Sequence, residues 1–212
     1  RVKAALASYD LPHSAHRLVR SAEEAAAAAA AIGFPVVLKI QSPDIPHKTD
    51  AGGVRLNLAD AGAVQTAYRE IVAAAQHYRP GAAIEGVLVQ RMAPKGHEIV
   101  IGVIDDDTFG PVVMVGFGGT TVELFGDVVH RPAPISEVEA AKMVRSLRSA
   151  RLLEGFRGAR TVDIAPLAAL IARISEAAID HRGRVREMEF NPVILHADGS
   201  GLTIADALMM LA

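Results

Sequence analysis

The chain has 212 residues, half of them hydrophobic and none of them cysteine, with a formal net charge of −2. Without cysteine the chain has no disulfide, no thiol catalysis and no cysteine-ligated zinc, and its balanced charge argues against electrostatically driven nucleic-acid binding. No uncharged apolar run reaches about 18 residues, so we expect no membrane span. The lack of cysteine fits an enzyme domain in the cytoplasm, where we expect the protein to be located. Because the chain begins at Arg1 and not at a methionine, we expect it to be a segment of a longer protein.

The first part of the chain predicts two helices with two strands between them. Ser21 to Glu24 form a capping box before an alanine-rich helix, which Gly33 is suited to end. A buried strand over 36–40 and a short strand over 54–58 flank a polar loop. An apolar spacing of three and four residues over 64–75 predicts an amphipathic helix.

The second part of the chain mixes strands that look paired as hairpins with two further helices. Its predicted elements are strands at 86–90, 98–104, 112–116, 185–191 and 202–206, a helix from Ser136 towards Arg151, and a helix beginning near Pro166. Hairpin-like pairs in place of regular strand–helix–strand units favour an α+β fold over a doubly wound parallel sheet. A break in composition over 86–96 is the best candidate for a boundary between two lobes.

Lys39 is the most informative charged residue, because it lies in the middle of the buried strand. A buried ammonium group is costly unless it meets an anion or a polar cleft. The following loop supplies His47, Lys48 and the pair Gly52 and Gly53, which are residue types that handle phosphate. Two interpretations stay open on these residues alone: a phosphate site, or a snorkelling lysine beside a solvated hairpin loop.

A second candidate site lies near the end of the chain. Alternate residues of a strand share a face, so Glu187, Glu189 and Asn191 project together, and Pro192 is expected to end the strand. Asp206 on the next strand can complete an oxygen-rich site of the kind that Mg²⁺ prefers. The alternative is a solvent-facing acidic edge.

Two glycine-rich segments are weaker signals. Residues 116–123 contain three closely spaced glycines and suit close approach by a ligand or a partner loop, although a plain tight connection is the commoner explanation of such a turn. Within 155–160, Arg157 or Arg160 could hold a phosphate, or could pair with Asp163 across the turn.

Several of these motifs together resemble a known family. They occur in the order Lys39, 45–54, 89–93, 96–102, 109–113, 116–123, 152–158 and 189–192. This order resembles the ATP-grasp domain of NDP-forming acyl-CoA synthetases, the acetate–CoA ligase (ADP-forming) type related to the succinyl-CoA synthetase beta chain. The resemblance covers nearly the whole chain.

The resemblance implies a single ATP-grasp domain over 1–212, with an α+β fold and the nucleotide held between two lobes. Each lobe would have a mainly antiparallel sheet and helices. The smaller lobe would span about 14–88, the hinge about 89–93 and the larger lobe about 94–212, with residues 1–13 packing on the larger lobe.

The resemblance also implies the roles of individual residues. Lys39 would contact the nucleotide phosphates beside Gly52 and Gly53. Gln90, Arg91 and Met92 would form the hinge where adenine binds, and Glu98 would approach the ribose. Asn191, Asp206 and Glu189 would bind Mg²⁺, and His47 would relay a phosphoryl group. These assignments make His47 and Lys39 the expected catalytic residues.

The implied function is phosphoryl transfer between ADP or ATP, with Mg²⁺, and a phosphohistidine on a partner CoA-ligase domain or subunit. The acyl and CoA sites would lie in that partner, so this chain alone would not complete the ligase reaction. The alternative is a nucleotide-sensing regulatory module in a fusion protein such as a protein acetyltransferase. Neither interpretation includes a nucleic-acid or membrane partner.

Overall fold

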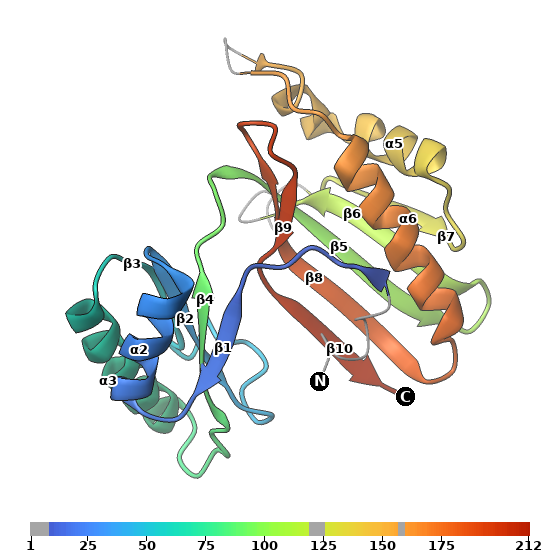
Figure 1. Ribbon diagram of the computed structural model, residues 1–212. Coiled ribbons are helices and arrows are strands. Elements are labelled where there is room, and N and C mark those ends of the chain that lie inside the picture. Colours follow the sequence, from blue (N-terminus) through green and yellow to red (C-terminus); the bar gives the residue numbers. More distant parts are fainter. Residues whose placement is uncertain (1–8, 119–125, 157–159) are drawn as a thin grey trace. The chain divides into compact units, whose positions relative to one another are not determined.

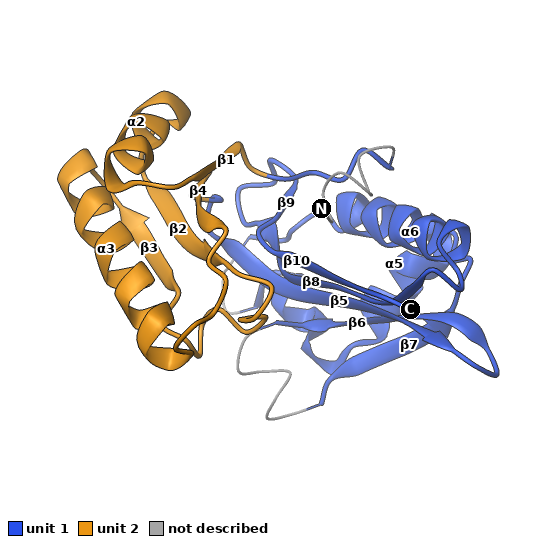
Figure 2. Ribbon diagram, turned by 90° about the horizontal axis from the view of Figure 1, so that it is seen from below, with its two compact units in different colours: residues 1–13, 93–212 blue, residues 14–92 orange. Residues whose placement is uncertain are grey.

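The computed structural model describes residues 9–118, 126–156 and 160–212 (Figure 1). The chain divides into two compact units, which Figure 2 shows in different colours. Unit 2 comprises residues 14–92, and unit 1 comprises residues 1–13 together with 93–212. Arg157 and the part of the glycine-rich segment at 119–123 lie outside the described residues.

Unit 2 is a four-stranded antiparallel sheet with two helices. Its elements are β1 (His16–Val19), α2 (Ala22–Ile32), β2 (Val36–Gln41), β3 (Val54–Leu58), α3 (Ala61–Tyr78) and β4 (Gly86–Arg91). The strand order is β1-β4-β2-β3, so the strand that carries Lys39 lies inside the sheet and pairs on both sides.

Helix α2 begins where the sequence predicts, with a different pattern of side-chain bonds. The Ser21 side chain accepts a hydrogen bond from the Glu24 N–H at 3.0 Å, as an N-cap should. The Glu24 carboxylate accepts from the N–H of Arg20 at 2.8 Å, where a capping box would use the N–H of Ser21 itself. At the other end, Gly33 follows the helix with φ 93°, a conformation that glycine adopts readily.

The core of unit 2 lies between its sheet and both helices. Alternate residues of β2, namely Val36, Leu38 and Ile40, are buried in the same apolar cluster as Ala25 of α2 and Ile71 of α3. Because side chains alternate along a strand, Val37 and Lys39 project from the opposite face of the sheet.

Unit 1 is built on a larger antiparallel sheet. Its elements are β5 (Gly96–Asp106), β6 (Gly110–Phe117), β7 (Val128–Pro132), α5 (Glu137–Ser146), the 3-10 helix η2 (Arg148–Leu152), α6 (Ala165–Asp180), β8 (Val185–His196), β9 (Leu202–Ile204) and β10 (Ala207–Leu211). The strand order is β10-β8-β5-β6-β7, with β9 also paired to β8. The predicted hairpin of two strands over 98–116 is confirmed as the antiparallel pair β5 and β6.

Strand β8 corrects one prediction from the sequence. Pro192 does not end the strand, because β8 continues to His196. The partner strand changes at the proline instead: β10 pairs with β8 up to Phe190, and β9 pairs with it from Val193 onward. Proline lacks an N–H donor, so it is tolerated where the ladder is interrupted.

Helices α5 and α6 cover one face of the large sheet (Figure 1). Helix α5 begins with the predicted capping box, in which the Ser136 hydroxyl and the Glu139 carboxylate each accept the other residue's backbone N–H. Pro166 lies in the first turn of α6, as predicted. Beneath these helices, alternate residues of β5, β6 and β8 are buried in one core, which includes Ile101 and Phe190.

The described residues before unit 2 belong to unit 1. The N–H of Ile204 donates to the carbonyl oxygen of Pro12 at 2.8 Å, and the Tyr9 hydroxyl donates to Asp180 at 2.7 Å. The predicted α+β class with two mainly antiparallel sheets is confirmed. Among the described helices, none is long and apolar enough to cross a membrane.

Candidate functional site

Lys39 lies on the face of the unit 2 sheet opposite to α2 and α3. Its Cα partners are Val54 on β3 and Leu88 on β4, so the lysine stem is flanked by apolar residues of both neighbouring strands. The residue is only 6% exposed. A cation held this rigidly by a central strand is pre-positioned for a defined partner, because little side-chain freedom remains to be lost on binding.

Gln90 lies on the same face of that sheet. It pairs with Val37 on one neighbouring strand and with His16 on the other. Val37 precedes Lys39 by two residues, so Gln90 and Lys39 project from the same face. Its side chain is 1% exposed, and its Oε1 atom has no hydrogen-bond partner among the described residues. A buried amide oxygen without a donor costs free energy, so this position favours a ligand that brings an N–H group.

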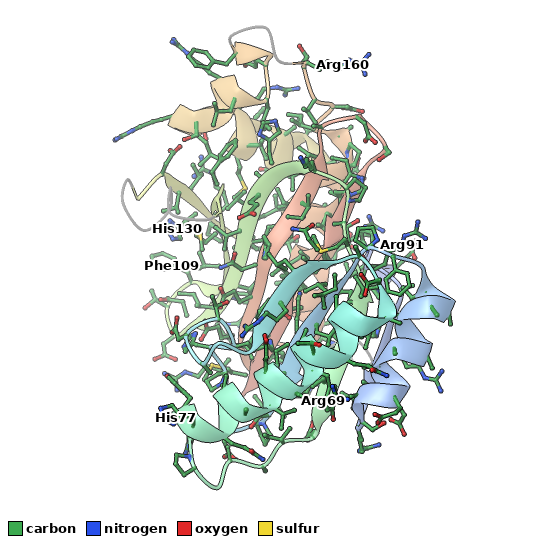
Figure 3. The ribbon with its side chains drawn as sticks, turned by 90° about the vertical axis from the view of Figure 1, so that its left-hand side faces the viewer. Arg69, His77, Arg91, Phe109, His130 and Arg160 are labelled. Carbon is green, nitrogen blue, oxygen red and sulfur yellow. The ribbon has the colours of Figure 1, made fainter. Side chains whose placement is uncertain are left out.

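Arg91 is the last residue of β4, and Met92, which follows it, is the last residue of unit 2. The N–H of Arg91 donates to the carbonyl oxygen of Ala15, and that of Met92 donates to the carbonyl oxygen of Pro35. These two hydrogen bonds hold the backbone in place at the end of β4. The Arg91 side chain, in contrast, is exposed (Figure 3).

The loop after β2 is anchored at two places and leaves His47 exposed. Ile45 is buried in the core of unit 2. The N–H groups of Gly52 and Gly53 donate to the carbonyl oxygens of Thr49 and Lys48, at 3.0 and 2.8 Å. A Cβ atom on Gly53 would lie 2.5 Å from Ile40 Cγ2, so only glycine allows this loop to close on β2. The two glycines therefore shape the loop that presents His47.

In unit 1, the face of the large sheet opposite to α5 and α6 carries the predicted acidic residues. Glu189 on β8 pairs with Gly102 on β5, and Gly102 pairs with Met114 on β6. A pocket of about 190 Å³ lies on this face. Its lining residues are Val100, Gly102, Val103, Ile104, Val112, Met114, His130, Glu187 and Glu189. The pocket thus combines an apolar floor with two carboxylates.

Glu189, Asn191 and Asp206 are brought together at the point where β8 changes partner. The Asn191 side-chain amide donates to Glu189 Oε1 at 3.0 Å, which confirms that these two side chains project together. The backbone N–H of Asn191 donates to the carbonyl oxygen of Asp206 at 3.2 Å. The stretch that the sequence predicts as one strand over 202–206 is broken before Asp206, which lies between β9 and β10.

The chemistry of this set fits a hard divalent cation. Two carboxylates and one amide oxygen match the few oxygen ligands that Mg²⁺ takes from protein when it also binds water and phosphate. In the described part of the chain, no group of three or more histidine, cysteine or acidic side chains is arranged as a metal site. The set has only two acidic members, so a metal here would need further oxygen ligands from a bound nucleotide.

Glu98 lies on the same face of the large sheet, because it precedes Val100 and Gly102 by two and four residues on β5. Its carbonyl oxygen accepts the N–H of Gly118 at 2.7 Å. A Cβ atom on Gly118 would lie 3.1 Å from the Glu98 Cβ atom, so the glycine permits this close approach. Of the segment 116–123, Gly118 is therefore packed directly against Glu98.

His130 and Glu187 line the pocket. The sequence places Glu187 on this face without giving it a role, and it gives no role to His130. His130 lies on β7, where it pairs with Met114 (Figure 3). A signal for Glu187 existed in its two-residue spacing from Glu189. No comparable signal existed for His130, because the register of β7 on β6 follows from pairing between distant segments.

Arg160 is exposed, and within the described residues it forms no ion pair with Asp163. Asp163 instead accepts the N–H of Ala165 at 2.9 Å, at the start of α6. Of the two arginines considered for a pair with Asp163, Arg160 does not form it among the described residues, and Arg157 lies outside them.

Comparison with known proteins places these features in context. A family model described as the ATP-grasp domain matches residues 1–211. The chain is 39% identical over 209 residues to the beta subunit of acetate–CoA ligase I (ADP-forming) of Pyrococcus furiosus, covering 99% of this chain and 89% of that subunit. It is 41% identical over 206 residues to acetate–CoA ligase I (ADP-forming) of Archaeoglobus fulgidus, covering 97% of this chain and 30% of that protein. The chain thus spans most of a separate beta subunit and less than a third of a longer relative.

Solved structures agree with the sequence relatives. The acetyl-coenzyme A synthetase 1 of Candidatus Korarchaeum cryptofilum, in complex with coenzyme A, Ca-AMPCP and HgCl+, superposes with a TM-score of 0.94 and 43% identity. That superposition covers 99% of this chain and 90% of the other. A second structure of the same enzyme holds coenzyme A and Mg-AMPPCP, with a phosphohistidine segment pointing towards the nucleotide binding site. Its TM-score is 0.82 and its identity 40%, over 98% of this chain and 88% of the other.

Proposed function

Because this chain belongs to the ATP-grasp family, as the beta-type part of an ADP-forming acyl-CoA synthetase, we propose that it exchanges a phosphoryl group between a phosphohistidine and ADP or ATP. The phosphohistidine belongs to the CoA-ligase part of the enzyme, supplied as a domain or as a subunit. The whole reaction converts acyl-CoA, ADP and phosphate into carboxylate, CoA and ATP. Two steps are assigned to this chain. In the first, the P–N bond to the partner histidine breaks as a P–N bond to His47 forms, and in the second, that bond breaks as a P–O bond to the terminal phosphate of ADP forms.

One observation carries this proposal: in each unit, the expected nucleotide-binding residues lie on the sheet face opposite to the helices. In unit 2 these are Lys39 and Gln90, and in unit 1 they are Glu98 and the group around Glu189. The retention of phosphate, base and metal residues in one chain supports catalysis over nucleotide sensing alone.

Unit 2 supplies the cationic and base-binding residues in this proposal. Lys39 neutralises the nucleotide phosphates, since phosphoryl transfer depends mostly on positioning and on charge neutralisation. Gln90 offers its unpartnered Oε1 atom to the amino group of adenine, and the backbone of Arg91 and Met92 borders the base. The loop shaped by Gly52 and Gly53 closes near the phosphates.

Unit 1 supplies the ribose and metal residues. Glu98 accepts a hydrogen bond from a ribose hydroxyl, while Glu189, Asn191 and Asp206 hold Mg²⁺. The ion, when bound, supplies neutralisation of the charge on the nucleotide phosphates. We also propose that the two units are the two lobes of the ATP-grasp domain, with residues 89–93 as the hinge between them and with further domains or subunits completing the enzyme.

His47 is the proposed relay for the phosphoryl group. A neutral imidazole nitrogen is nucleophilic near pH 7, which an ammonium group is not. His47 is exposed at the end of an anchored loop, so a phosphohistidine segment of a partner can approach it. Because ADP, ATP and CoA are cytoplasmic metabolites, the proposed reaction places the protein in the cytoplasm.

Calorimetric titration with ADP, with and without Mg²⁺, tests the proposal. We expect Lys39→Met to weaken ADP binding about 10- to 100-fold, because hydrogen bonds to charged groups contribute about 1.5–3 kcal/mol. Lys95→Met is the matched control, since Lys95 is exposed in the turn before β5 and has no assigned role. If the unaltered chain binds no adenine nucleotide, the proposal is wrong. If both lysine variants bind ADP equally well, Lys39 has been assigned wrongly.

A further inference from the structure

A stripe of basic side chains follows α5 and η2 in unit 1. Residues 142–160 contain six basic side chains and one acidic one, in a chain whose net charge is −2. We define the basic stripe as Lys142, Arg145, Arg148 and Arg151, all of which are exposed. Their spacing of three residues keeps them along one side of the helical turns, while Met143, Leu147 and Ala150 face the core.

Among the described residues, no salt bridge involves a side chain of the basic stripe, although the positive charge of Arg148 acts on the nearby Asp127 carboxylate. The salt bridges among the described residues involve other arginines, at positions 55, 69, 173 and 182. Charges of one sign gathered on one side of a domain produce a local potential that attracts an oppositely charged partner, even when the net charge of the chain is negative.

Apolar features adjoin the stripe. Leu152, the last residue of η2, and Phe156, which follows it, expose 39% and 50% of their surface. A pocket of about 420 Å³ lies between the end of α5, η2 and the segment before α6. It is lined by Val144, Arg145, Ala150, Leu153, Glu154, Thr161, Val162, Asp163 and Ile164. The lining of the pocket is apolar in part and also includes the Glu154 and Asp163 carboxylates. Such a pocket, an exposed aromatic ring and arginines are together typical of a protein–protein interface.

The stripe is fixed to the part of unit 1 that carries the proposed nucleotide residues. The buried Asp127 carboxylate accepts the N–H groups of Arg148 and Ser149, at 2.9 and 2.8 Å, and so ties the start of η2 to the start of β7. Strand β7 pairs with β6, whose end packs through Gly118 against Glu98. In Figure 1 the segment after α5 lies beyond the end of the large sheet, and in Figure 3 Arg160 marks that end of unit 1.

From these observations we propose that the basic stripe, with Leu152, Phe156 and the adjoining pocket, is the docking surface for the CoA-ligase part of the synthetase. That partner would present an acidic segment with an apolar side chain that enters the pocket. This inference rests on the proposed function, which requires a partner that carries the phosphohistidine. The longer relative has more than two thirds of its length beyond the matched region, so such a partner needs a contact surface on this module.

Binding to the separately produced CoA-ligase part, measured by calorimetry at low and high salt, tests the stripe. We expect Arg148→Glu combined with Arg151→Glu to weaken binding about tenfold or more at low salt, with a smaller difference at high salt, because rim charges act through screened electrostatics. Arg148→Lys with Arg151→Lys should keep most of the affinity. The matched control is Arg17→Glu with Arg20→Glu, which reverses two exposed charges in unit 2.

The apolar part of the surface has its own test. Phe156→Ala should weaken partner binding about tenfold or more, since truncation of an aromatic anchor commonly costs that much. Phe109→Ala is the matched control, because Phe109 is 69% exposed in the β5–β6 hairpin of the same unit (Figure 3). Equal affinities for the unaltered chain and the Phe156 and stripe variants would overturn the inference, as would no binding at all.

Two further measurements separate this inference from the proposed function. ADP affinity should be the same in the stripe variants as in the unaltered chain, and loss of ADP binding by the unaltered chain would refute the proposed function itself. An oligonucleotide is the competing polyanionic probe. If the stripe variants lose oligonucleotide binding but keep partner binding, the surface serves nucleic acid and the inference is wrong.

Discussion

Asp127 shows how one buried carboxylate holds a local structure together. It is 8% exposed. Burial alone raises the pKa of this carboxyl group, but the hydrogen bonds from the Ser149 side chain and from the Arg148 and Ser149 N–H groups outweigh burial and lower the pKa below its usual value. The charged form is therefore favoured in the folded state.

The lowered pKa predicts the pH range in which Asp127 stabilises the fold. Its contribution is fully present above the unfolded-state pKa of about 4 and is lost as the pH falls through the lower folded-state pKa. We expect Asp127→Asn to lower the free energy of unfolding by about 1–3 kcal/mol near neutral pH, and by less in acid. Urea unfolding of both proteins between about pH 3 and pH 7 measures this difference.

Asp107→Asn is the control for that experiment, because Asp107 is exposed in the β5–β6 hairpin. It should leave the free energy of unfolding nearly unchanged at every pH. A constant difference between the unaltered chain and Asp127→Asn across the whole pH range would contradict the assigned cause.

His47 carries a second prediction at this scale. In the complete synthetase, His47→Asn should reduce the turnover number about a hundredfold or more while leaving ADP affinity nearly unchanged, because the imidazole is needed for the transfer and not for binding. His77→Asn, which alters an exposed histidine on α3, should change neither quantity. Full turnover by His47→Asn would remove the relay from the mechanism.

At the residue scale, the sequence predicted those positions whose chemistry conflicts with their local pattern. Lys39 was recognisable because a charge interrupts a buried strand, and Glu189 with Asn191 because both share one strand face. The position of His130 in the pocket could not be predicted, because it depends on how β7 pairs with β6. The break before Asp206 could not be predicted either, because β9 and β10 pair with successive stretches of the same edge of β8.

At the scale of helices and strands, the connection between β7 and α5 is held by a buried serine of α6. The hydroxyl of Ser175 accepts the N–H of Ile135 at 3.0 Å and donates to the carbonyl oxygen of Ala172 at 2.7 Å. Both atoms of the Ile135 contact lie away from solvent, so water cannot replace the serine.

Removal of that hydroxyl should destabilise unit 1. Ser175→Ala leaves the buried N–H of Ile135 without an acceptor, and we expect the free energy of unfolding to fall by about 1–3 kcal/mol. Ser146 is an exposed residue whose hydroxyl donates to the carbonyl oxygen of Met143, and Ser146→Ala should change the free energy of unfolding by less than about 0.5 kcal/mol. Equal denaturation midpoints for Ser175→Ala and the unaltered protein would show that water or a rearranged backbone replaces the bond.

The elements themselves were largely predictable, and their ends were less so. Helix starts followed from Ser21 and Ser136, because capping is a local interaction. The end of β8 did not follow from Pro192, because a proline stops a strand only where the neighbouring strand requires its N–H. At Pro192 the neighbours change, so the strand continues.

At the scale of the whole molecule, the described residues form two apolar cores that share no residue. One contains Ile71 and the other Ile171, and both side chains are fully buried. Separate cores allow the two units to open with different free energies, so unfolding need not be two-state.

Core truncation should therefore act on one unit at a time. Ile71→Ala should lower stability by about 2–5 kcal/mol and should increase hydrogen exchange within 14–92 more than within 93–212. Ile171→Ala is the matched substitution in the other core and should give the opposite pattern. Mass spectrometry of exchanged peptides measures both, and a uniform increase over the whole chain would show that the two cores unfold together.

The discontinuity of unit 1 has a consequence for how the protein is made. Residues 14–92 form one uninterrupted stretch, whereas Pro12 and His13 must meet Ile204, close to the other end of the chain. On the ribosome, unit 2 can complete its sheet while most of unit 1 is still untranslated, because domains generally fold as units in the order in which they emerge. The segment before His16 is then attached to a folded unit, and it cannot form its contacts with Ile204 until β9 has left the exit tunnel. Translation therefore imposes an order on assembly: the inserted unit comes first, and the unit that surrounds it in the sequence closes last.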